Sequence, residues 1–102
     1  PVAHRAGDLT VDPGSRRVWR GDTEISLTAR EFAVLEHLIR HRGDVVSKRD
    51  LIAGVWNDDF EGDPNIVEVY VGHLRRKLDR PFSRNAIETI RGAGYRLAAD
   101  GG

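Results

Sequence analysis

The segment 64–97 constrains the fold most strongly, because a helical pattern there gives way directly to a hairpin pattern. Asp63 and Pro64 form a typical helix start, with Asp as the N-cap residue and Pro in the first turn. The spacing predicts a helix over 64–78, and Pro81 prevents a long continuation. Four apolar residues recur on one face of this helix: Val67, Val71, Leu74 and Leu78.

The hairpin pattern follows the helix after a short polar connection. Residues 87–90 and 95–97 have the composition of two short strands. The residues 91–94 between them read Arg-Gly-Ala-Gly, which is a glycine-rich turn. We therefore expect a β-hairpin over about residues 87–97.

Two further helices precede this segment. Thr28 and Glu31 form a capping box, in which each side chain can bond to the backbone amide of the other residue. The apolar stripe that follows consists of Phe32, Leu35, Leu38 and Ile39. We expect Gly43 at the C′ position of this helix. Ser47 begins the second helix, and its apolar residues are Leu51, Ile52, Val55 and Trp56.

Short strands precede the helices, because apolar and polar residues alternate there. We expect these strands at residues 9–12, 17–20 and 24–27. We interpret residues 1–6 as a polar tail or linker and residues 99–102 as a C-terminal tail, which leaves 7–98 as one domain. The order of elements predicts an α+β fold: a winged helix-turn-helix with an N-terminal antiparallel sheet, three helices and a C-terminal β-hairpin wing.

The composition fits one globular domain and narrows the chemistry. The 102 residues include 16 basic and 16 acidic side chains, 39% apolar residues and no Cys. No apolar run is long enough to span a membrane, and the lack of Cys excludes disulfides and thiolate nucleophiles. The charge is uneven, since residues 64–97 hold seven basic and three acidic side chains. This basic surplus lies in the segment that holds the expected helix and hairpin.

The side of helix 64–78 opposite its apolar stripe mixes polar, basic and apolar groups. At 100° per residue, this side carries Asn65, Val69, Gly72, His73 and Arg76, and its edges carry Ile66, Tyr70 and Lys77. Arg, Asn and His can hydrogen-bond to base edges in a DNA major groove, whereas Val and Tyr can contact a thymine methyl group or a sugar. The alternative is a helix that packs on two sides in the protein interior.

The residues described so far resemble a known family over about residues 7–98. The chain is similar to the C-terminal DNA-binding domain of response regulators of the OmpR/PhoB family. The matching motifs are Leu27-Thr28 with Glu31-Phe32 and Leu35; Val46-Ser47 with Leu51, Val55 and Trp56; Val67, Val69, Val71, Leu74, Arg75 and Leu78; and Ile90-Arg91-Gly92 with Gly94-Tyr95-Arg96. The resemblance implies a four-stranded N-terminal sheet. It also implies a bacterial, cytoplasmic transcription factor of a two-component phosphorelay that binds double-stranded DNA.

The resemblance also implies roles for individual residues. Backbone-contacting positions on the helices are Lys48, Trp56, Asn65, Ile66 and Arg75, and base-facing positions are Val69, Tyr70 and His73. In the hairpin, Thr89 and Tyr95 match backbone contacts and Arg91 matches a side chain that enters the minor groove. Arg76 joins this set from the helix face opposite the apolar stripe. For Arg91 the alternative is an ion pair with a carboxylate such as Glu88, which would only brace the hairpin.

One departure from the family and several partners follow from the same comparison. Relatives often carry a basic pair where this chain has Gly72 and His73, and a mid-helix Gly weakens the helix.

Loop 57–63 matches the segment through which some family members contact RNA polymerase. The chain starts at Pro1, so we expect an upstream receiver domain in a longer protein. We expect the isolated domain to be a monomer that pairs as a dimer on direct-repeat DNA half-sites.

Other functions remain as alternatives. A winged helix can serve as a protein-interaction module towards RNA polymerase or a receiver domain, and some regulators with this domain lack a receiver. His37 and His41 are spaced to share a metal ion, and the loop carboxylates resemble a sparse cation site: Asp58, Asp59, Glu61 and Asp63. Neither set has an orderly group of ligands. We expect no metal, no cofactor and no enzymatic activity.

Overall fold

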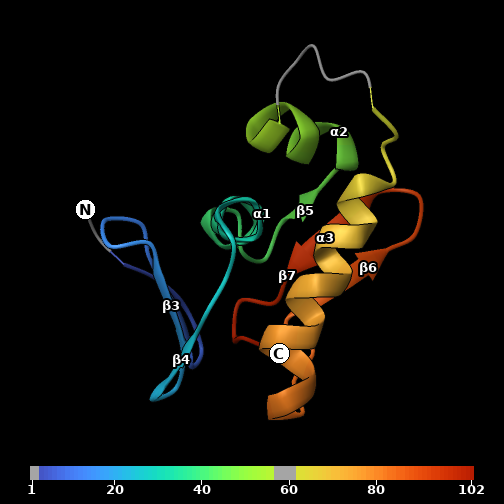
Figure 1. The fold of residues 1–102 in the computed structure, drawn as a ribbon. Helices are drawn as coiled ribbons and strands as arrows, with labels where there is room; N and C mark the ends of the chain where they lie inside the picture. Colours follow the sequence, from blue (N-terminus) through green and yellow to red (C-terminus); the bar gives the residue numbers. More distant parts are fainter. Residues whose placement is uncertain (1–2, 57–61) are drawn as a thin grey trace.

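The N-terminal quarter of the chain forms a four-stranded antiparallel sheet. The computed structural model describes residues 3–56 and 62–102. The sheet has the order β1-β2-β3-β4, with β1 (His4–Ala6), β2 (Leu9–Asp12), β3 (Arg17–Arg20) and β4 (Thr23–Ile25). Figure 1 shows this sheet on one side of the first helix, with the third helix and a second sheet on the other side.

The remaining elements follow in the order that the sequence predicts, with one added strand. They are α1 (Ala29–Arg40), β5 (Val45–Val46), α2 (Lys48–Leu51), η1 (Ile52–Trp56), α3 (Ile66–Leu74), η2 (Arg75–Asp79), η3 (Arg80–Phe82), β6 (Ile87–Ile90) and β7 (Gly94–Leu97). The two segments η1 and η2 are π-helical continuations of α2 and α3, and η3 is a 3₁₀ turn. The hairpin β6–β7, which we call the wing, pairs with β5 in a second sheet of order β5-β7-β6. The predicted α+β winged-helix architecture is confirmed.

The core lies where α1 meets the third helix and the two sheets. The predicted stripes of α1 and of the helical run α3–η2 are buried throughout: Phe32, Leu35, Leu38, Ile39, Val67, Val71, Leu74 and Leu78. The N-terminal sheet contributes Leu9, Val11 and Val18, and the wing contributes Tyr95 and Leu97. These contacts fix the position of α3 relative to the wing, the two elements that carry most of the predicted site residues.

The helix starts follow the predicted local chemistry. The Thr28 hydroxyl accepts from the Glu31 amide at 3.2 Å, and the Glu31 carboxylate accepts from the Thr28 amide at 2.9 Å. The Ser47 hydroxyl accepts from the Asp50 amide at 3.1 Å. The expectation for Gly43 is wrong by one position, because α1 ends at Arg40 with His41 as its C-cap. Gly43 has a positive φ, and its amide donates to the Leu97 carbonyl at 2.8 Å.

The third helix starts two residues later than predicted. The Asp63 carboxylate accepts from the Asn65 amide at 2.9 Å, so it caps a turn that precedes the regular helix. Asn65 is the N-cap residue of α3, although its side chain forms no cap hydrogen bond. The helical run then continues through η2, and Pro81 lies within the 3₁₀ turn η3 that ends it.

The described residues of both predicted tails contact the domain instead of extending away from it. His4–Ala6 form β1 and pair with β2, although the sequence shows no alternation there. At the other end, Gly101 is buried and its amide donates to the Ala98 carbonyl at 3.0 Å. The Gly102 carbonyl accepts from Arg84 at 3.0 Å. The described parts of both tails therefore pack against the domain.

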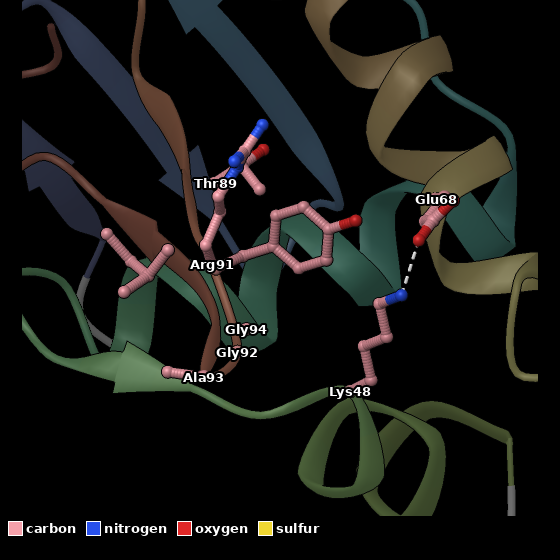
Figure 2. A pocket seen from close by; sticks show the side chains of 9 residues that line it. Lys48, Glu68, Thr89, Arg91, Gly92, Ala93 and Gly94 are labelled. Atoms are coloured by element: carbon pink, nitrogen blue, oxygen red, sulfur yellow. Dashed lines mark hydrogen bonds and ion pairs between the residues drawn. The ribbon is translucent and has the colours of Figure 1, made fainter.

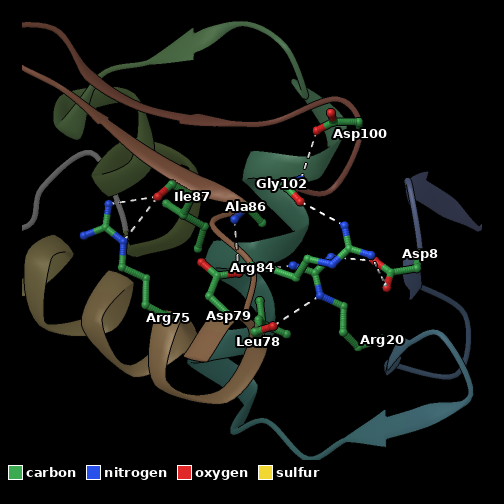
Figure 3. A network of polar contacts seen from close by, with 10 residues as sticks. All are labelled: Asp8, Arg20, Arg75, Leu78, Asp79, Arg84, Ala86, Ile87, Asp100 and Gly102. Carbon is green, nitrogen blue, oxygen red and sulfur yellow. Dashed lines mark hydrogen bonds and ion pairs between the residues drawn. The ribbon is translucent and has the colours of Figure 1, made fainter. Parts of the chain in front are cut away.

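A buried arginine joins the N-terminal sheet to the end of the third helix. The Arg20 guanidinium donates to the Leu78 carbonyl at 3.2 Å, to Asp79 at 3.2 Å and to Asp8 at 2.8 Å. The Asp79 carboxylate also accepts from the Ala86 amide at 3.1 Å. Figure 3 shows this network between the sheet, the helix end and the segment that leads into the wing. The end of the helical run is thus bonded both to the N-terminal sheet and to the segment before the wing.

Candidate nucleic-acid interface

One face of the third helix is open to solvent and carries the predicted mixture of groups. Asn65, Val69 and Arg76 are exposed, and Val69 retains 50% of its accessible surface. A half-exposed valine contradicts the alternative of a helix packed on two sides. An added Cβ at Gly72 would meet no atom within 4 Å, so this part of the helix surface is free. We call the surface formed by residues 65, 69, 72 and 76 the open face.

One edge of α3 packs against η1 through aromatic groups. The Tyr70 ring stands edge-on to the Trp56 ring, with the centroids 5.4 Å apart. The Arg30 guanidinium lies over the Trp56 ring at 5.1 Å, and it donates to the Val55 carbonyl at 2.8 Å. Tyr70, Trp56 and Ile66 are therefore only partly exposed, and they position η1 beside α3.

The His73 side chain lies beside α1 rather than wholly on the open face. Its Nδ1 is 3.3 Å from one oxygen of the buried Glu31 carboxylate, and the Lys77 ammonium donates to the other oxygen at 2.7 Å. Burial alone would raise the pKa of Glu31, but the hydrogen bonds from Lys77 and Thr28 and the nearby positive charge outweigh it and lower that pKa. This cluster ties α3 and η2 to the start of α1.

Arg75 joins the helical run to the wing. Its guanidinium donates to the Ile87 carbonyl at 2.9 and 3.2 Å and to the Thr89 hydroxyl at 2.7 Å. The first of these contacts is visible in Figure 3. The structure thus brings together Arg75 and Thr89, which the resemblance predicted as two separate contacts with the DNA backbone.

A pocket of about 450 Å³ lies between α2, α3 and the wing. Its lining includes Lys48, Glu68, Thr89, Arg91 and Tyr95 as well as the backbone of the wing turn. Figure 2 shows the Lys48 and Glu68 side chains meeting across this pocket, where the ammonium donates to the carboxylate. Tyr95 is buried, and its burial, together with the charge of Glu68, raises the pKa of its phenol.

The wing turn presents Arg91 to solvent. Arg91 is exposed and lies beside the same pocket. The Glu88 carboxylate accepts from Arg96 at 2.8 Å, so the alternative in which Glu88 pairs with Arg91 is wrong. Gly92 has a φ of 75° and Gly94 a φ of 142°, which are conformations that favour glycine and shape the turn.

In the structure the predicted residues lie on three neighbouring parts of the surface: the open face, the pocket on one side of it, and the edge towards α1 and η1 on the other side. The open face carries Asn65, Val69 and Arg76, and the pocket beside it carries Lys48, Thr89, Arg91 and Tyr95. Trp56, Ile66, Tyr70 and His73 lie on the edge towards α1 and η1. Glu68 was not among the predicted residues, although its position between the open face and the buried stripe could have signalled a charged edge residue.

The described residues contain no group of three or more His, Asp or Glu side chains placed to hold a metal ion. The His37 and His41 rings lie 5.1 Å apart, and burial together with the charges of His41 and Arg40 lowers the pKa of His37. Asp58, Asp59 and Glu61 of the predicted cation site lie outside the described residues. Within the described ranges, every helix is too short or too polar to cross a bilayer.

The model of one protein family matches residues 22–97, and its description is "Transcriptional regulatory protein, C terminal". The chain belongs to this family. The predicted resemblance to response regulators of the OmpR/PhoB type is thereby confirmed. Over all 102 residues the chain is 52% identical to the transcriptional regulatory protein TcrA of Mycobacterium tuberculosis, of which it covers 40%. It is 41% identical over 98 residues to CusR of Escherichia coli, and the match covers 96% of this chain and 43% of CusR.

A solved structure shows the same fold. The RstA DNA-binding domain of Klebsiella pneumoniae, determined in complex with the RstA box, superposes with a TM-score of 0.85 at 29% identity. The superposition covers 97% of this chain and 99% of that domain. The chain spans about two fifths of the length of the curated relatives that it matches.

Proposed function

We propose that this chain binds double-stranded DNA in a sequence-specific manner. The open face of α3, beside a pocket lined by cationic and hydroxyl groups, carries the proposal. An exposed helix face fits the major groove, and the neighbouring wing is placed to reach the flanking backbone and minor groove. The RstA DNA-binding domain, which has the same fold, was crystallised in complex with the RstA box, and this supports the same class of ligand here.

In this proposal the site residues divide by position. Val69 and Arg76 face base edges, with Tyr70 and His73 at the margin of the groove, and Val69 suits a thymine methyl group. Phosphate contacts come from Lys48, Trp56, Asn65, Ile66, Thr89 and Tyr95. Arg75 supports these contacts by holding Thr89, with which it shares a hydrogen bond at 2.7 Å. Arg91 enters the minor groove.

Membership of the family supports a proposal for the wider role of the protein. We propose that the chain is the effector domain of a two-component response regulator, that it acts in the cytoplasm on transcription, and that it catalyses no reaction. An upstream receiver domain would control it, and two copies would pair on direct-repeat half-sites. Loop 57–63 is the proposed contact with RNA polymerase, and residues 57–61 of that loop lie outside the described residues.

Selection of duplexes from a random pool tests the proposal and identifies the preferred sequence in the same experiment. We expect the 102-residue chain to enrich one short motif. Variants of the open face, such as Val69→Ala, should change the enriched motif or weaken its selection. A pool that stays random after repeated rounds would contradict sequence-specific binding. If the chain enriches no duplex but binds a protein such as RNA polymerase or a receiver domain, the result would instead favour the protein-interaction module.

A further inference from the structure

Glu68 shares the wing pocket with four residues of the proposed DNA-binding set. Those four residues are Lys48, Thr89, Arg91 and Tyr95. Among the described residues that line this pocket, Glu68 alone is acidic. A DNA phosphate that reached Lys48 would therefore come close to a negative charge.

The carboxylate of Glu68 already accepts a hydrogen bond from the ammonium of Lys48. The two groups form a hydrogen-bonded ion pair, with 37% of the Lys48 side chain and 53% of the Glu68 side chain exposed. The hydrogen bond to Glu68 raises the pKa of Lys48 above its usual range. Because both partners are open to solvent, a phosphate can reach this pair directly.

Folding alone does not account for this pair. Exposed ion pairs contribute little to stability, because solvent screens them and both side chains lose freedom. The two helices that the pair connects are already anchored by buried residues, Leu51 in α2 and Val67 in α3. The location of the pair in the wing pocket, rather than its contribution to stability, distinguishes it.

We propose that Glu68 competes with the DNA backbone for Lys48 and so lowers the affinity of the domain for every duplex. This inference rests on the proposed DNA-binding function. A phosphate in the pocket must replace the carboxylate at the lysine and tolerate its charge nearby. Both effects are independent of the base sequence, because they concern the phosphate alone. Glu68 thus weakens the sequence-independent part of the binding energy, which DNA with and without the preferred motif shares.

The competition makes a specific prediction for paired substitutions. If Lys48 leaves Glu68 when it binds a phosphate, Lys48→Ala costs less affinity when Glu68 is present than when it is replaced by Gln. If the two residues act separately, the two costs are equal. A double-mutant cycle therefore separates competition from simple repulsion of the phosphate by Glu68.

The probe is a fluorescein-labelled duplex of mixed sequence, about 20 base pairs long, titrated by anisotropy at several salt concentrations. We expect Glu68→Gln to bind roughly 5-fold more tightly at low salt and to steepen the slope of log K against log salt by up to about 0.9, the value for one phosphate. Glu24→Gln is the matched control, since Glu24 is an exposed carboxylate paired with Arg17 at 2.8 Å in the N-terminal sheet. It should leave both quantities unchanged.

Three results would overturn the inference. Unchanged or weaker binding by Glu68→Gln would show that the carboxylate does not compete, and equal costs in the cycle would show that it does not act through Lys48. A gain confined to one duplex sequence would show that Glu68 contacts a base instead. If the wild-type chain binds no duplex at any salt concentration, the proposed function itself fails, and this outcome is distinct from the other three.

Discussion

The guanidinium of Arg20 in β3 lies 3.2 Å from the carboxylate of Asp79, at the end of the helical run that begins with α3. The side chains of both residues are almost fully buried, with 0% and 4% exposed. The ion pair therefore connects the N-terminal sheet directly to the helix that carries the open face. The sheet is part of the support for the proposed interface.

Arg20→Met should destabilise the domain severely. The substitution removes the cation and leaves the Asp79 carboxylate buried, with only the Ala86 amide among its described hydrogen-bond donors. Loss of one partner of a buried pair costs about 3–5 kcal/mol of unfolding free energy. Domains of this size have only about 5–15 kcal/mol in total. Urea unfolding followed by circular dichroism measures the loss.

Arg17→Met is the control for this prediction. Arg17 lies in the same strand and pairs with Glu24 at 2.8 Å, but both side chains are about half exposed. We expect its urea midpoint to stay close to that of the wild type. Equal effects of the two substitutions would show that burial of the Arg20 pair does not matter.

The Glu31 carboxylate should make the domain sensitive to acid. Its pKa is lowered in the folded state below the ordinary value of 4.5, so the folded protein binds fewer protons there than the unfolded chain. The stabilisation is present above about pH 4.5 and is lost as the pH falls through the lowered pKa of the folded state. Unfolding free energies measured from pH 7 to about pH 3 should fall less steeply for Glu31→Gln than for the wild type. Parallel curves would contradict this role.

Two glycines should respond to alanine in opposite ways. Gly72 lies inside α3 with free space around it, so Gly72→Ala should stabilise the domain by about 0.5–1 kcal/mol. Gly94 has a φ of 142°, and a Cβ there would lie 2.1 Å from the Val46 carbonyl oxygen. Gly94→Ala should destabilise the domain by about 1 kcal/mol or more, because the wing must shift away from β5. Thermal unfolding of both variants tests the pair, and a stabilising Gly94→Ala would contradict the described wing geometry.

The features that the sequence predicts correctly depend on local chemistry. The Thr28 capping box, the Ser47 cap and the apolar stripe of α3 each involve residues within one or a few turns of a helix. Their energies are set by neighbouring residues, so they can be inferred without the rest of the fold. The family resemblance supplied the fourth N-terminal strand, which the alternation alone did not show.

The features that the sequence missed depend on contacts between distant segments. Strand β5 has only two residues and exists because Val46 pairs with Tyr95 across the second sheet. Long basic side chains were the least predictable, since each can reach several partners. Arg75 bonds to the wing, and Arg20 is buried among Asp8, Asp79 and a backbone carbonyl. Which partner an arginine takes is decided by the assembled fold.

Arg91→Ala should weaken binding most on duplexes whose flank is rich in A·T pairs. The minor groove is narrow and strongly negative over such tracts, so an exposed arginine gains most there. Arg96→Ala is the control, because Arg96 lies in the same wing and pairs with Glu88 at 2.8 Å. It should affect wing stability without altering the preference for the flank. Affinities for A·T-rich and G·C-rich flanks test this, and an Arg91→Ala variant that keeps the wild-type preference would refute the minor-groove role.

The central claim is that the open face of α3 and the wing pocket together contact duplex DNA. An NMR titration of the ¹⁵N-labelled chain with its selected duplex tests this claim most directly. We predict that the largest amide shifts fall in residues 65–76 and 89–95 and around Lys48, while the N-terminal sheet, β1 to β4, changes little. Shifts concentrated on that sheet, or no shifts with any duplex at low salt, would contradict the account.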